Sequence, residues 1–166
     1  MSFRALYERR VTDPADLDAI ILFHDADFVA DEITFDQTQA VVEIVFDQDV
    51  RYLPENLPLP QLRDQRRHWI GSSAVVPFVE CRLVVRNARG FTLTGDDVKW
   101  GILGTARFDA EESRLVLDSG VGPDIVIPVE ELDVSVAISN RTRAFRRLRK
   151  RGPVESMSAR LPQQSD

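Results

Sequence analysis

The densest group of side chains that could do chemistry is the run His24-Asp25-Ala26-Asp27, with Asp31 a few residues on. An imidazole and carboxylates are ligand types that divalent metals take in proteins. In an extended segment Asp25, Asp27 and Asp31 lie on one side, so a cleft lined by His24, Asp25 and Asp27 is one candidate site. Metal ligation requires a further convergent residue that the spacing does not supply. The plainer interpretation is that His24 ends a helix and the aspartates hydrate a turn and an exposed strand face.

A second group, Arg66-Arg67-His68-Trp69, lies in a proline-rich segment. It could bind an anion or the acidic surface of a partner, with the tryptophan as anchor. The alternative is a solvated loop whose Trp69 packs into the core. Cys81, the only cysteine, lies on the apolar face of a predicted strand, which indicates a buried and unreactive thiol. The glycines lack the spacing, the lysine and the following helix of a phosphate loop. No motif in the sequence names a reaction, a cofactor or a metal.

The most unusual composition is that of residues 141–151, which hold seven basic residues and no acidic one. These are Arg141, Arg143, Arg146, Arg147, Arg149, Lys150 and Arg151. Residues 1–140 hold 13 basic and 25 acidic residues, a net charge of −12. The basic residues could pair with this acidic body within or between subunits, bind nucleic acid or anionic lipid, or form a soluble tail. Because an acidic body repels nucleic acid, pairing with the body is the favoured interpretation.

Length and composition bound the class of protein. A chain of 166 residues with 43% hydrophobic content predicts one globular domain. No apolar run approaches the roughly 18 residues of a membrane span. The N-terminus lacks the pattern of a secretory signal, and a single cysteine forms no internal disulfide. We therefore expect a reducing compartment, most simply a bacterial cytoplasm.

Hydrophobic periodicity predicts the elements. Asp13 and Pro14 are typical of a helix start, and the spacing of Leu17, Ile20 and Ile21 predicts a helix over 14–23. The period then changes to two, which predicts a hairpin over 27–47 and, after an irregular segment at 48–72, a meander over 74–139. Two runs of that meander each place one set of side chains on a buried face: Trp100, Ile102, Ala106 and Phe108; Leu132, Val134, Val136 and Ile138.

Short strands joined by tight turns favour an antiparallel arrangement. We expect a mainly β (α+β) fold, in which the meander forms a curved sheet or a small sandwich with the N-terminal helix against it. The expected domain covers residues 1–140. Residues 141–166 are expected to form a short basic helix, with Ala144, Phe145 and Leu148 on one side, followed by a disordered tail.

The order of these features resembles known small bacterial proteins. A helix precedes His24-Asp25-Ala26 at the opening of a hairpin, and Arg66-Arg67 precedes a strand and a meander. This order resembles small uncharacterised bacterial β-rich proteins. It is also similar to immunity-type proteins of bacterial toxin systems, in which a His-Asp-Ala or His-Asp-Ser step opens the first strand. The resemblance spans residues 14–138 as a pattern, its motif is three residues long, and it carries no functional residue over.

These observations favour a non-catalytic protein-binding or assembly module, either self-associating or bound to a protein partner. One alternative is a small enzyme or ligand carrier that uses a cleft lined by His24, Asp25, Asp27 and His68. Another is binding of nucleic acid through residues 141–151. No cofactor is expected.

Overall fold

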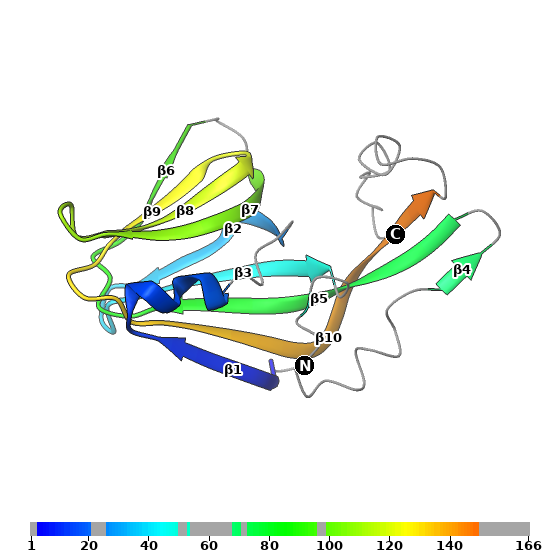
Figure 1. The fold of residues 1–166 in the computed structure, drawn as a ribbon, viewed down its shortest axis with the longest axis horizontal. Coiled ribbons are helices and arrows are strands. Elements are labelled where there is room, and N and C mark those ends of the chain that lie inside the picture. The colour runs from blue at the N-terminus through cyan, green and yellow to red at the C-terminus, as the bar shows by residue number, and fades with distance from the viewer. Residues whose placement is uncertain are drawn as a thin grey trace.

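The computed structural model of the chain describes residues 3–20, 26–49, 53, 68–70, 73–95 and 99–149, with the backbone alone for 18–20, 68–70, 73–77 and 140–149. The described residues form one antiparallel sheet of ten strands with a short 3-10 helix (Figure 1). The elements are β1 (Ala5–Val11), η1 (Pro14–Ile20), β2 (Ala26–Asp36), β3 (Val41–Asp49), β4 (His68–Ile70), β5 (Ser73–Val85), β6 (Thr92–Thr94), β7 (Trp100–Asp109), β8 (Arg114–Val121), β9 (Asp124–Pro128) and β10 (Val134–Arg149). Their order across the sheet is β1-β10-β5-β3-β2-β7-β8-β9-β6, and β4 pairs with β5. The predicted mainly β, antiparallel fold is confirmed.

The predicted hairpin over 27–47 is confirmed as β2 and β3. Ile33 lies opposite Ile44 and both are buried, as the alternating pattern requires. The turn follows from local chemistry, because the Asp36 carboxylate accepts the backbone N–H groups of Thr38 at 2.9 Å and Gln39 at 3.0 Å. Within the segment expected to be irregular at 48–72, β3 extends to Asp49 and the short β4 forms at His68–Ile70.

The sheet bends at a narrow corner where β2 meets β7. Only Ala26–Val29 of β2 pair with Trp100–Leu103 of β7, which makes four residue pairs among the described strands. Both strands are irregular next to this junction: β2 bulges between Phe28 and Ile33 against β3, and β7 shifts register after Ile102 against β8. Bulges increase twist and bend a strand, so they allow one sheet to turn a corner.

The two halves of the bent sheet share one hydrophobic core. The half β1-β10-β5-β3-β2 contributes Ile44, Leu83 and Ile138, and the half β7-β8-β9-β6 contributes Leu115 and Ile127, all in the same buried cluster. Figure 1 shows the strands of the two halves lying in two layers. The question of a curved sheet or a sandwich, which the sequence leaves open, is thus answered by one sheet that folds over its own core.

The helix expected over 14–23 is not found at that length in the described residues. Pro14–Ile20 form a 3-10 helix, and residues 21–23 lie outside the described part. The predicted cap is present, since the Asp13 carboxylate accepts the Ala15 N–H at 2.9 Å. The helix contacts β1 and β7, and its Leu17 joins the core. The short helix therefore connects strands of the two layers.

The expected basic α-helix at 141–151 is wrong. Residues up to Arg149 belong to β10, which pairs with β5 from Val134 opposite Val85 to Arg149 opposite Ser73. β10 therefore runs through the domain boundary expected at residue 140. Helix propensity is a weak preference. Here it is overridden because β5, which is rich in valine, supplies a hydrogen-bonding partner for the strand. Figure 1 shows β5 and β10 continuing beyond the two layers, with β4 beside them. Residues 150–166 lie outside the described part.

No helix in the described part of the chain has the length and apolar character that crossing a membrane requires.

Candidate functional site

The first predicted cluster is only partly within the described residues. His24 and Asp25 lie outside them, as do Arg66 and Arg67. Asp27 is described and half-buried on β2, and in register it lies between Asp47 of β3 and Ile102 of β7. His68 lies on β4 opposite Val75, and Trp69 opposite Ala74, both beside the end of β5. The strand pairing thus places Asp27 at the corner and His68 beside the end of β5, and the two residues are not paired with each other or with a common residue.

Asp27 belongs to a row of carboxylates that crosses three neighbouring strands. It lies opposite Asp47, which in turn lies opposite Glu80 of β5. Glu80 is buried and its carboxylate lies 3.6 Å from the Arg82 guanidinium, which also reaches Glu43 at 3.4 Å. The Phe3 ring covers Arg82, with its centroid 4.2 Å from the guanidinium carbon. Within the described residues, no three histidine, cysteine or carboxylate groups are arranged to hold a metal ion.

Cys81 is buried on the core face of β5, as predicted. Burial raises the pKa of its thiol well above the ordinary value, and the nearby charges of Asp47 and Glu80 raise it further. Its Sγ lies 3.8 Å from the Val79 carbonyl oxygen, which can accept a weak S–H hydrogen bond. Because the thiolate is the reactive form, this environment makes Cys81 a poor nucleophile.

Asp133 is the centre of a second cluster of polar side chains, which lies on the half of the sheet formed by β1, β10, β5, β3 and β2. The Arg10 guanidinium donates to both of its carboxylate oxygens, at 2.7 and 2.6 Å, and Arg86 lies 3.5 Å away. Arg86 also donates to the Ser135 hydroxyl at 3.1 Å. The hydrogen bond from Arg10 does most to lower the pKa of Asp133. Asp133, which directly precedes β10, and Ser135 on β10 are both buried beside these two arginines.

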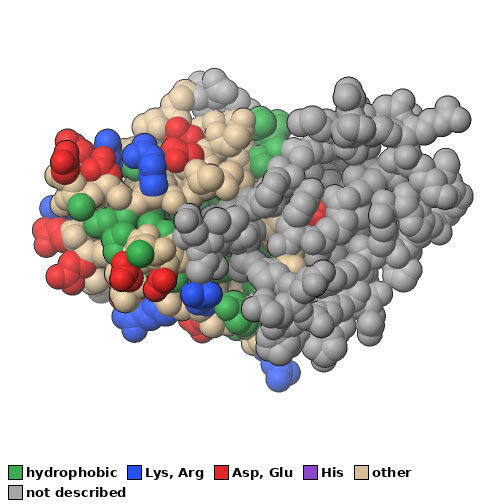
Figure 2. All heavy atoms as spheres, viewed as in Figure 1, with side chains coloured by type: hydrophobic (Ala, Val, Ile, Leu, Met, Phe, Trp, Pro, Cys, Tyr) green, Lys and Arg blue, Asp and Glu red, His purple; other side chains and the backbone are tan. Residues whose placement is uncertain are grey.

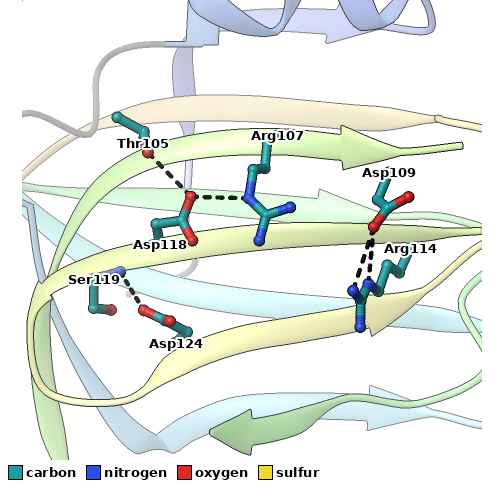
Figure 3. Close-up of polar contacts among 7 residues, drawn as sticks. All are labelled: Thr105, Arg107, Asp109, Arg114, Asp118, Ser119 and Asp124. Carbon is teal, nitrogen blue, oxygen red and sulfur yellow. Dashed lines mark hydrogen bonds and ion pairs between the residues drawn. The ribbon is translucent and has the colours of Figure 1, made fainter. Parts of the chain in front are cut away.

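The polar side chains of β7, β8 and β9 are engaged with one another (Figure 3). Asp118 accepts from Thr105 and Arg107 at 3.3 Å each. Asp109 accepts from Arg114 across the next step of the β7–β8 ladder, at 3.3 and 3.4 Å. These cross-strand pairs join adjacent strands, which is the arrangement of a structural ladder.

The corner between the layers carries an exposed apolar patch that sequence reasoning missed. Val29 and Trp100 lie directly opposite each other and are 42% and 50% exposed. Val121, which is 47% exposed, lies opposite the buried Ile102. Gly101 faces the core, because a Cβ there would lie 2.5 Å from the Phe28 ring. Trp100 and Ile102 therefore alternate to the outer side. We call Val29, Trp100, Ile102 and Val121 the corner patch.

The prediction that Trp100 shares a buried face with Ala106 and Phe108 is thus wrong. The register shift of β7 after Ile102 moves the two ends of the strand onto opposite faces, so Ala106 and Phe108 pack on the core while Trp100 does not. Strict alternation across an undetected bulge assigns one end of a strand to the wrong face. The available signal was the pair of glycines, Gly101 and Gly104, which often mark such irregularities.

The basic strand is the second candidate surface. Arg141, Arg143, Arg146, Arg147 and Arg149 lie on β10, whereas Lys150 and Arg151 lie outside the described part. On one side β10 pairs with β5 as far as Arg149. On the other side β1 pairs with it only from Val134 to Ser139. Among the described strands, none lies against that side of Thr142–Arg149. We call this stretch the basic edge.

Comparison of the chain with family models, with curated proteins and with solved structures finds no match. The resemblance to immunity-type proteins therefore stays a prediction.

Proposed function

We propose that this protein is a non-catalytic binding or assembly module that recognises a protein partner through the basic edge of β10. The observation that carries the proposal is a strand with cationic residues that is paired on one side only, over Thr142–Arg149, within the described residues. The N–H and C=O groups along such an edge form a template for another strand, which is how many domains bind extended segments. Main-chain pairing supplies affinity, and the arginines select an acidic partner.

Charge supports this assignment against simple edge-to-edge pairing of two basic strands. Two copies of Thr142–Arg149 paired with each other would gather eight arginines and no carboxylate, and this concentration of like charge disfavours the pairing. The other outer strands are less suited to recognition. β1 carries both signs of charge, Glu8 beside Arg9 and Arg10, so it does not select an acidic partner, and β4 and β6 are each only three residues long.

The test is retention of partners by the immobilised full-length protein from a nuclease-treated lysate. Each retained protein is then identified, purified and measured against the wild type and two variants. Reversal of two edge charges, Arg146→Glu with Arg147→Glu, is expected to weaken binding by about a hundredfold if each contact contributes roughly 1.4 kcal/mol. Arg89→Glu is the control, because Arg89 is an exposed arginine on the body that lies outside the basic edge, and its ion pair with the exposed Glu130 spans 3.6 Å.

Three outcomes would contradict the proposal. The first is a monomeric protein that retains nothing. The second is binding that the edge reversal leaves unchanged. The third is binding of nucleic acid in place of protein, with affinity that falls steeply as salt is added, which would favour the phosphate-binding alternative.

A further inference from the structure

The corner patch is an apolar surface that the chain itself leaves open. Trp100, Val29 and Val121 each keep 42–50% of their surface exposed, with Ile102 buried between them. Their pairing across β2, β7 and β8 makes the patch contiguous. Exposed tryptophans surrounded by apolar side chains are the usual anchors of protein interfaces.

Negative charge borders this patch. Asp27 lies in register beside Ile102, and Asp31 is exposed on the bulged part of β2, two residues beyond Val29. Lys99, which precedes Trp100, is the one basic residue that directly adjoins the patch in sequence. Two such patches facing each other would bring carboxylates together, so contact between identical corners is disfavoured. The occupant should combine apolar and cationic side chains.

The chain contains one segment of that composition. Thr142–Arg149 carries Phe145 and Leu148 among its arginines. Arginine stacks on the face of a tryptophan and pairs with carboxylates, and Trp100 with Asp31 offers both partners. This segment is the basic edge, the same strand that β1 leaves unpaired beyond Ser139 in the described part.

We propose that the corner patch of one copy binds the basic edge of a second copy, so that the protein assembles with itself. The inference rests on the proposed function and names the partner, with side chains of the basic edge making the contact, because the corner patch lies on the face of strands already paired with one another. If each copy gives its basic edge to the other's corner, the contact closes into a two-fold dimer, and a head-to-tail arrangement would continue into a chain of copies. In both cases Trp100 is the central contact.

Light scattering coupled to size-exclusion chromatography, or sedimentation, across a concentration series tests the assembly. The wild type is expected to grow in mass with concentration, and Trp100→Ala to weaken the association by about tenfold or more. Leu93→Ala is the matched control, because Leu93 is 39% exposed but lies on β6, away from the corner. A melting temperature of each variant equal to that of the wild type would show that the fold is intact.

A charge exchange tests the proposed contact between the corner patch and the basic edge. Asp31→Arg and Arg147→Asp are each expected to weaken association, and the double variant to recover part of the loss. Recovery would identify the corner and the edge as partners. A wild type that stays monomeric at every concentration, or association that Trp100→Ala leaves unchanged, would overturn the inference. If that monomer still captures a different, identified protein through Arg146 and Arg147, the proposed function stands and only self-assembly is refuted.

Discussion

Asp133 shows how much a single carboxylate can hold together in this sheet. It receives both ends of the Arg10 fork from β1 and lies 3.5 Å from Arg86, which follows β5. Three neighbouring chain segments thus meet at one side chain whose exposed fraction is 12%. Because Asn keeps the shape but loses the charge, we expect Asp133→Asn to lower the free energy of unfolding by about 1–3 kcal/mol. Urea denaturation at neutral pH measures this change.

The same variant has a defined pH dependence. The pKa of Asp133 is lowered in the folded state, chiefly by the Arg10 hydrogen bond. A carboxylate with a lowered pKa stabilises the fold above its unfolded pKa, and that contribution is lost as the pH falls through the folded pKa. The difference between wild type and Asp133→Asn should therefore be constant from pH 7 to about pH 5 and shrink below about pH 4.

Glu130→Gln is the control at the same scale. Its ion pair with Arg89 spans 3.6 Å between side chains that are 77% and 60% exposed. Such pairs contribute little, so the change should stay within about 0.5 kcal/mol at any pH. An Asp133→Asn variant as stable as Glu130→Gln would mean that Asp133 does not anchor β1.

At the scale of elements, the turn between β8 and β9 supports the corner. Gly122 has a φ of 85°, and a Cβ there would lie 2.3 Å from the Trp100 carbonyl oxygen. We expect Gly122→Ala to cost about 1–3 kcal/mol, because the strained backbone and the close contact add. Gly120→Ala is the control two residues away, since nothing lies within 4 Å of its Cβ. Thermal unfolding of the two variants separates the effects, and equal stabilities would exclude a close approach at Gly122.

Elements were predictable wherever local pattern and final environment agree. The β2–β3 hairpin follows from alternation and from the Asp36 turn, and both are local. The strand at the basic edge was missed because its partner, residues 73–79 of β5, lies more than sixty positions earlier in the chain. Ala144, Phe145 and Leu148 fit a helical face, and no nearby residue signals that β5 continues far enough to pair with them.

The candidate site was predictable only in part for a similar reason. The cationic residues of the basic edge are evident from composition. That they lie on a strand edge follows only from the structure, in which β10 extends beyond its pairing with β1. Trp100 could not be predicted to be exposed, because a bulge after Ile102 decides which face of the sheet its side chain takes. Asp27 was identified as part of a polar cluster, but its neighbours Asp47 and Ile102 come from strands that only the fold brings beside it.

At the scale of the whole molecule, β10 divides into two regions of different protection. Val134–Ile138 lie between β1 and β5, so both sides of the strand are hydrogen-bonded. Along Thr142–Arg149 only the side facing β5 has a described partner. Amide hydrogen exchange in dilute solution should be slow over 134–138 and faster at alternate amides of 142–149. Protection of the second region should rise with protein concentration if copies assemble, and uniform protection in the dilute monomer would mean that the edge is already covered.

The pairing of β1 with β10 also dictates when the fold can be completed. Arg10 and Asp133 are separated by 123 positions. During synthesis the first strand therefore has no partner until nearly the whole sheet has emerged, and such long-range closure makes folding slow. Until that moment the edge of β5 that β10 will occupy stays open to other chains. The arginine carried by β1 is thus expected to act late, as the contact that closes the sheet after the rest of the core has formed.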